Sequence, residues 1–270
     1  MSPSPKSKGI ADLADPQQSL PFWPAHLRGV PTAALYSALF APIRKGARAA
    51  VQREKIAAVG AFKIVYTGFR LDQADLDVFE HVLHLFRGKG VGGAIRISIR
   101  EMLKGVGRAQ GKSQREWLLK SLSRLQACAV EIQKEHLAYS GSLVQEFVRD
   151  EKEGIYTLTL NPRLAALFDQ GYSPIVWQQR QALTRPLAQW LHGFTSGQRH
   201  PLSFRLEALA SYADSGYARD RDFRAALEEA AEDIRNVGVD LLILWSADGK
   251  TATFTRKAWK GATAMPPGGA

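Results

Sequence analysis

The sequence predicts an α+β protein of two winged-helix domains in tandem. Each half of the chain holds three segments whose apolar residues recur at helical spacing, followed by shorter segments that suit paired strands. Turns that contain glycine or proline separate these segments. Two helix–helix–helix–hairpin series in a row are the pattern expected of two winged-helix domains.

The first half begins with a strand and a helix. Residues 62–66 are mostly β-branched or aromatic, which favours a strand. Apolar residues at helical spacing predict a helix over 71–86. Asp72 and Asp75 stand near its start, where the helix dipole favours carboxylates. Four glycines within 88–93 then end the helix and form a connector.

A helix–turn–helix pattern comes next. A strand pattern over 95–99 leads into a first helix, a glycine-containing turn and a second helix over 112–128. Asn161 is the expected N-cap of a later helix, with Pro162 at its first position. The strands expected between these helices span residues 130–138, 143–149 and 155–160, with a hairpin turn at 140–142 between the first two.

The second half repeats this plan loosely. Its clearest turn is the dipeptide Asp248 and Gly249, which is typical of a hairpin. The predicted elements are helices over 183–194, 206–212 and 222–237 and strands over 241–245 and 251–255.

The chain is basic, and its charge is clustered. The formal net charge is +10, and within residues 96–124 eight Lys or Arg stand against two Glu, a net of +6. A folded basic segment makes nucleic acid the leading partner class, with a merely basic protein as the alternative. The single cysteine, Cys128, excludes an intrachain disulfide and a thiolate metal site, which suits a reducing cytosol.

The composition of the two ends differs from that of the middle. The start is rich in Pro, Ser and Gly and lacks the apolar core of an export signal, and no stretch of the chain is apolar enough to cross a membrane. The expected organisation is a flexible N-terminal arm over 1–30, a first domain over 31–165, a second domain over 166–258 and a disordered tail over 259–270. The two domains are expected to join near 161–173.

The helix over 112–128 is the main candidate for DNA binding. Leu118, Leu122 and Leu125 form an apolar stripe that can pack on the domain, which leaves the cationic side free to enter a groove. Gln114 and Arg115 suit bidentate contacts to adenine and guanine. An ordinary solvated helix face is the alternative. The predicted DNA-binding residues are Lys112, Ser113, Gln114, Arg115, Lys120 and Arg124.

A second cluster of cations stands where the helix over 222–237 begins. Arg219, Arg221 and Arg224 are predicted to bind DNA as well. Further along, this helix carries four acidic residues, so only its N-terminal end suits a DNA groove. A solvent-facing helix is the alternative here too.

No pattern indicates an enzyme. The chain contains neither a phosphate-binding loop motif nor the His-Glu-x-x-His motif of zinc proteases. Its six histidines are scattered, so we expect no catalytic residues, no metal site and no cofactor.

Three strings carry a family resemblance. They are Ser-Ala-Leu-Phe at 37–40, Phe-Lys-Ile-Val-Tyr-Thr-Gly-Phe-Arg-Leu-Asp at 62–72 and Leu-Ser-Arg-Leu-Gln-Ala at 122–127. Together they resemble the TrfA family of plasmid replication initiators, over about residues 19–256. The resemblance implies a bacterial, cytoplasmic, plasmid-associated protein whose two winged helices bind direct repeats (iterons) in double-stranded DNA at the origin.

The resemblance also implies roles and partners. Such initiators help to melt the origin and recruit host initiator and helicase proteins, and they have no catalytic site. Family members switch between a homodimer and a DNA-bound monomer, so a second copy is a further expected partner. Residues 112–120 and Arg124 match the reading helix of the first domain, and 219–224 matches that of the second.

The N-terminal segment contains a short peptide that looks like a docking motif for the DNA polymerase sliding clamp. Gln17, Ser19, Leu20 and Phe22 fit the pattern Gln-x-Ser-Leu-x-Phe. A flexible arm can present Leu20 and Phe22 to an apolar pocket. The alternative is a staple that packs the arm onto its own domain.

Two other function classes compete with replication initiation. A winged-helix transcriptional repressor would share the DNA-binding surface. An adaptor without DNA binding would use the clamp peptide and the basic surface to gather replication proteins.

Overall fold

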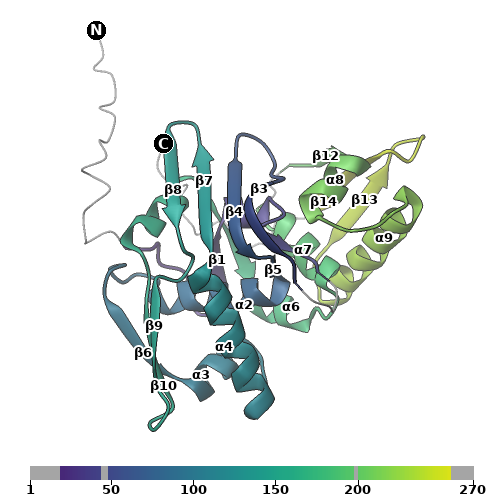
Figure 1. Ribbon diagram of the computed structural model, residues 1–270. Helices are drawn as coiled ribbons and strands as arrows, with labels where there is room; N and C mark the ends of the chain where they lie inside the picture. Colours follow the sequence, from purple (N-terminus) through teal and green to yellow (C-terminus); the bar gives the residue numbers. More distant parts are fainter. Residues whose placement is uncertain (1–18, 44–47, 198–199, 257–270) are drawn as a thin grey trace.

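The computed structural model describes residues 19–43, 48–197 and 200–256. Buried apolar residues form two cores that follow one another along the chain, the first from Leu20 to Ile175 and the second from Leu183 to Phe254. We call the parts built around them the first unit and the second unit. Figure 1 shows them side by side. The change of core comes later than the expected domain boundary at residue 165.

The first unit is a mixture of helices and small sheets. Its elements are β1 (Leu27–Pro31), α1 (Thr32–Leu35), β2 (Phe40–Ala41), β3 (Ala50–Ile56), β4 (Lys63–Phe69), β5 (Leu71–Asp72), α2 (Gln73–Phe86), β6 (Ala94–Ser98), α3 (Ile99–Gly105), α4 (Lys112–Ala127), β7 (Ala129–Lys134), β8 (Leu137–Gly141), β9 (Glu146–Asp150), β10 (Ile155–Thr159), η2 (Pro162–Ala165), α5 (Ala166–Asp169), β11 (Tyr172–Val176) and α6 (Trp177–Ala182).

The second unit is smaller. Its elements are α7 (Pro186–Phe194), β12 (Leu202–Arg205), α8 (Leu206–Ala213), α9 (Asp220–Asn236), β13 (Leu241–Trp245) and β14 (Thr251–Arg256).

The two units share one order of elements. In the first unit α2, β6, α3 and α4 precede the hairpin β9–β10, and in the second α7, β12, α8 and α9 precede the hairpin β13–β14. The sheets also match, because the strand before the helix pair lies beside the last hairpin strand in both, in the orders β6-β10-β9 and β12-β14-β13. The repeat of helices and hairpin expected from the sequence is therefore present.

The hairpin expected directly after α4 is wrong in its turn and in its second strand. The chain turns at Glu135 and His136, and Glu135 adopts a positive φ of 55°. Ser140 cannot turn because it pairs with Glu131 on β7. β7 and β8 extend β3 and β4 into a four-stranded sheet, and β9 pairs with β10 instead. The first unit thus carries an inserted hairpin that the second unit lacks among its described residues.

Residues 19–30, expected to belong to a flexible arm, pack on the first unit. Trp23 is fully buried, and its Nε1 donates a hydrogen bond to Nδ1 of His84 at 3.0 Å. Strand β1 pairs antiparallel with β11. Burial of a tryptophan removes enough apolar surface from water to hold such a segment in place. Residues 1–18 and the expected tail over 259–270 lie outside the described residues.

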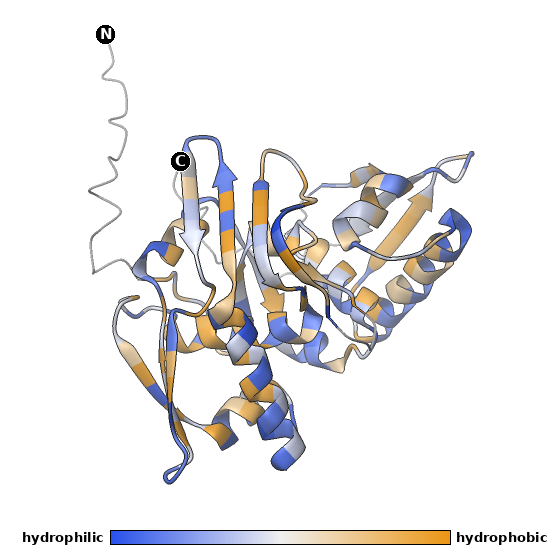
Figure 2. Cartoon of the chain, viewed as in Figure 1, coloured by the Kyte–Doolittle hydropathy of each residue, from blue (hydrophilic) through white to orange (hydrophobic). Residues whose placement is uncertain are grey.

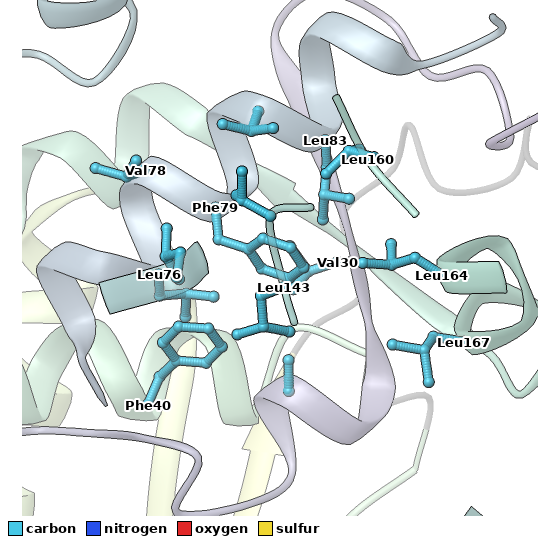
Figure 3. Close-up of a cluster of buried hydrophobic side chains, with 14 of the residues drawn as sticks. Val30, Phe40, Leu76, Val78, Phe79, Leu83, Leu143, Leu160, Leu164 and Leu167 are labelled. Carbon is cyan, nitrogen blue, oxygen red and sulfur yellow. The ribbon is translucent and has the colours of Figure 1, made fainter. Parts of the chain in front are cut away.

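Helix α2 runs through the middle of the first core. Asp72 and Asp75, which were expected near its start, form a capping box there. Figure 3 shows Phe79 of α2 pointing toward Val30 and Leu143, which come from distant parts of the chain. Its ring lies 5.9 Å from that of Phe40. No helix among the described residues is long and apolar enough to span a bilayer.

Glu80 of α2 makes stability depend on pH. Its carboxylate is fully buried without a hydrogen-bond partner among the described residues, and burial raises its pKa to about 8, against the opposing effect of Arg180. The folded state therefore holds a proton that the unfolded state releases, so the contribution of Glu80 to stability falls as pH rises toward 8.

Replacing Glu80 by glutamine removes this ionisation. Between pH 6.5 and 8 we expect the unfolding free energy of the wild type to fall by roughly 1–2 kcal/mol relative to that of Glu80→Gln, because the buried histidines contribute equally to both proteins. Urea unfolding at several pH values measures the difference. Glu116→Gln, at an exposed carboxylate, is the control and should keep the wild-type slope. Parallel slopes for wild type and Glu80→Gln would contradict the assignment.

Candidate nucleic-acid interface

Helix α4 is the main element of the candidate interface. Gly111 precedes it with φ of 145°, a backbone conformation that favours glycine. Leu118, Leu122 and Leu125 are completely buried, as the apolar stripe predicts. The opposite side of the helix faces solvent, and Figure 2 shows hydrophilic residues gathered at its N-terminal end.

A buried carboxylate on α2 holds the middle of α4 in place. Both oxygens of Asp75 are out of solvent. They accept hydrogen bonds from Ser121 Oγ at 2.6 Å and from Arg124 at 2.6 and 3.1 Å. Arg48 adds an ion pair with Asp75 at 3.3 Å. Only 15% of the Arg124 side chain is exposed, so this predicted DNA-binding residue lies mainly between α4 and α2.

The other cations predicted on α4 are free. Lys112, Arg115 and Lys120 are exposed, and none forms an ion pair with any described residue. Ser113 is exposed beside them. Gln114 is half-buried, and its Oε1 is out of solvent without a hydrogen-bond partner in the described part of the chain. In the first turn of α4, the cationic side chains are therefore accessible to a ligand, whereas the side-chain amide oxygen of Gln114 is not.

Helix α3 and the turn before α4 extend the basic surface. Arg96, Arg100 and Lys104 are exposed. The guanidinium of Arg108 lies 4.2 Å from the ring centre of Trp117 on α4, which braces the turn against the helix.

The hairpin β9–β10 adds a cation that the sequence analysis missed. Arg149 is exposed and lies 3.0 Å from Glu151. Burial raises the pKa of Tyr156 on β10, and the positive charges of Arg149 and Arg115 oppose that rise. The acidic residues around Arg149 in sequence hide it from an analysis of local charge.

The second unit presents α9 in the position that α4 has in the first. Phe223, Leu227 and Ile234 bury one side of α9. Arg219 and Arg221 are largely exposed at its start, where both contact Asp222, at 2.8 and 3.4 Å. Arg224 is exposed and lies 4.6 Å from the ring centre of Trp245 on β13. The structure therefore brings all three predicted arginines to one end of α9.

The acidic part of α9 is engaged within the second unit. Arg185 pairs with Glu229 at 2.5 Å and with Asp233 at 3.2 Å. Glu228 accepts a hydrogen bond from Nε1 of Trp245. These contacts partly neutralise the side of α9 that would repel DNA and leave the arginine end free.

The predicted clamp peptide is split between core and surface. Leu20 is 1% exposed, whereas Phe22 is 71% exposed. Gly88 donates a backbone hydrogen bond to the carbonyl of Leu20 at 3.1 Å. Ser19 is exposed, and Gln17 lies outside the described residues. The Leu20 side chain therefore packs onto its own domain, which is the alternative to clamp binding considered for this segment.

The histidines do not form a metal site in the described part of the molecule. No group of three or more potential ligands gathers there. Burial lowers the pKa of His81 to about 4 and that of His84 to about 3, with nearby Arg28 and Arg87 acting in the same direction. Both rings are thus neutral parts of the core.

Comparison with known proteins gives a consistent family and fold. Residues 7–250 match the model of the family described as TrfA protein. The plasmid replication initiator protein TrfA of Escherichia coli is 28% identical over 227 residues, which cover 80% of this chain. The same match covers 59% of that relative, so the chain spans well under two thirds of its length.

Two solved structures share the fold. Domains 2 and 3 of RctB superpose with a TM-score of 0.55 at 13% identity, over 84% of this chain and 98% of theirs. The Pi initiator protein, solved in complex with iteron DNA, gives a TM-score of 0.55 at 10% identity, over 70% of this chain and 94% of its own. At such low identity the likeness concerns the fold alone.

Proposed function

The chain belongs to the TrfA protein family, and from this premise we propose that it is a plasmid replication initiator. It binds iteron repeats at the origin, promotes origin opening and recruits host replication proteins. The observation that carries the proposal is the repeated unit: α4 and α9 hold equivalent positions, and each carries exposed cations at its N-terminal end. The name of the curated relative and the iteron complex of Pi support the same function.

Each unit is a winged helix in this proposal. The helix pairs α3–α4 and α8–α9 are the helix–turn–helix motifs, and the hairpins β9–β10 and β13–β14 are the wings. The two domains meet between Ile175 and Leu183, where the buried core changes. The inserted strands β7 and β8 belong to the first domain.

The exposed cations divide between phosphate contacts and base contacts. In this proposal the exposed Arg115, in the first turn of α4, contacts guanine, while Lys112 and Lys120 contact phosphates. Ser113 and Gln114 lie in the same turn. Arg124 supports α4 through Asp75 and adds positive charge at its edge. In the second domain Arg219, Arg221 and Arg224 approach the groove from the start of α9, and no residue is assigned to catalysis.

Plasmid maintenance tests the proposal against the repressor alternative. A plasmid that carries only the origin repeats and a selectable marker should persist in cells that supply this protein in trans. A repressor binds the repeats but does not maintain the plasmid. Loss of the plasmid despite confirmed binding of the repeats would therefore contradict initiation and favour repression.

Recruitment of the sliding clamp is part of the proposal, together with the host initiator, the helicase and a second copy of this chain. Replacing Phe22 by alanine should lower clamp capture at least tenfold without changing the melting temperature, because this ring is exposed and has little packing to lose. Leu20→Ala is not a clean test of clamp binding, because it removes a side chain that is buried in the first core.

A pull-down with purified clamp measures this prediction. Val148→Ala, at another exposed apolar side chain of the first unit, is the matched control and should be captured like the wild type. Equal capture of wild type and Phe22→Ala would show that the peptide does not bind the clamp.

A further inference from the structure

Arg180 lies at the junction of the two units and is buried. It stands on α6, just before residues 183–185, which lead into α7, and 1% of its side chain is exposed. A buried guanidinium is costly unless its donors are satisfied, so its partners indicate what it holds together.

The guanidinium of Arg180 joins a helix of each unit. Toward α2 of the first unit it donates to Asp77 Oδ1 at 2.8 Å, to Gln73 Oε1 at 2.8 Å and to the Gln73 carbonyl at 3.0 Å. Toward α7 of the second unit it donates to the Gln189 carbonyl at 2.7 Å. The fork of one side chain therefore fixes α7 against α2.

Two further contacts cross the junction away from Arg180. The ring of Tyr36 lies 5.5 Å from that of Phe194. Arg70, at the end of β4, pairs with Asp214, which ends α8 in a left-handed conformation with φ of 44°. Contacts at separate places oppose rotation of one unit about the other.

Resting on the function proposed above, we infer that Arg180 is a positioning residue that sets the angle between the units, so that α4 and α9 meet one DNA repeat at a fixed spacing. Because α4 packs on α2 and α9 packs on α7, fixing α7 against α2 fixes the two reading helices as well. The protein then recognises the spacing between the two places on the DNA that α4 and α9 contact, in addition to the bases at each place.

Arg180→Lys tests this inference without DNA. Lysine keeps the charge opposite Asp77, but its single ammonium cannot span both helices. Spin labels on exposed positions of α4 and α9, introduced as Ser123→Cys and Glu232→Cys, should give one narrow distance in the otherwise unaltered protein and a clearly broader distribution with Arg180→Lys. Arg28→Lys is the control, because Arg28 is also buried and its hydrogen bonds stay within the first unit.

Binding to altered repeats links the geometry to function. Inserting about half a helical turn (~5 bp) between the two contact sites should weaken wild-type binding at least a hundredfold and Arg180→Lys binding less than tenfold. Arg28→Lys should behave like the wild type. Asp214→Asn keeps a residue suited to the left-handed conformation but removes the ion pair with Arg70. It should also reduce the loss of affinity caused by the insertion, by a smaller factor than Arg180→Lys does. This variant replaces Arg180→Lys in the test if Arg180→Lys does not fold.

The outcomes separate the two proposals. A label distance as narrow in Arg180→Lys as in the wild type overturns the inference, whatever the DNA results. If Arg180→Lys does not fold, a label distance in Asp214→Asn that is as narrow as in the wild type overturns the inference instead. A wild type that binds no repeat contradicts the proposed function instead, while the label distances still decide whether Arg180 holds the units.

Discussion

Replacing Asp75 by alanine is expected to lower the free energy of unfolding by about 3–5 kcal/mol. Removing one partner of a buried ion pair leaves the other charge without compensation. Asp75 is fully buried and accepts bonds from Ser121 and Arg124, and Arg48 pairs with it as well. Urea denaturation followed by circular dichroism measures the loss.

A double-mutant cycle isolates the contact between α2 and α4. If Arg124 acts mainly through Asp75, the double variant Asp75→Ala with Arg124→Ala should cost clearly less than the sum of the two single changes. Asp222→Ala is the control, because this carboxylate pairs with two arginines on an exposed helix end and its loss should change stability little. Strictly additive effects of the Asp75 and Arg124 changes would contradict the coupling.

Removing the free cations of α4 is expected to weaken DNA binding by about a hundred- to a thousandfold. Lys112→Ala and Lys120→Ala should lower affinity for all sequences alike and flatten the salt dependence by ~2 in slope, because each lysine releases counterions from one phosphate. Arg115→Ala should cost ~1–3 kcal/mol at one base position and relax specificity there.

Fluorescence anisotropy with repeat DNA and scrambled DNA at several salt concentrations measures both effects. Lys55→Ala with Lys63→Ala is the matched control, because these lysines are exposed on β3 and β4 rather than on α4. An equal loss for Arg115→Ala on scrambled DNA would refute a base contact. Wild-type affinity in the triple variant of α4, which combines Lys112→Ala, Arg115→Ala and Lys120→Ala, would show that α4 is not part of the interface.

Much of the fold follows from local patterns in the sequence. The apolar spacing of α4 reports its buried side correctly because helical periodicity is a property of neighbouring residues. The same holds for α9 and for the turn at Asp248 and Gly249. Each of these features depends on a short stretch of chain.

The features that the sequence missed depend on distant contacts. The Ser-Gly-Ser composition at 140–142 is a strong local turn signal, so it draws the expected turn there, whereas the chain turns at Glu135 because β8 pairs with β7 through Ser140. The composition of residues 1–30 as a whole favours disorder, yet Trp23 packs against residues from much later segments, including His84 and Phe168. Tertiary packing overrides local composition there.

The candidate site likewise has some features that local sequence predicts and others that depend on distant contacts. Local charge places the cations of α4 and α9 at the correct ends of their helices. It cannot distinguish Arg124 from Lys120, because the partner of Arg124 is a carboxylate 49 positions earlier in the chain. It also misses Arg149, which joins the basic surface only because β9 pairs with β10 and lies beside α4.

The central claim is that α4 and α9 bind side by side on one repeat of origin DNA. Hydroxyl-radical footprinting on the plasmid's own origin tests it most directly, with the wild type, the triple variant of α4 and a variant with Arg219, Arg221 and Arg224 changed to alanine. The account predicts two adjacent protected stretches in each repeat, one lost in each variant. No protection of repeats by the wild type, or loss of the same stretch in both variants, would contradict it.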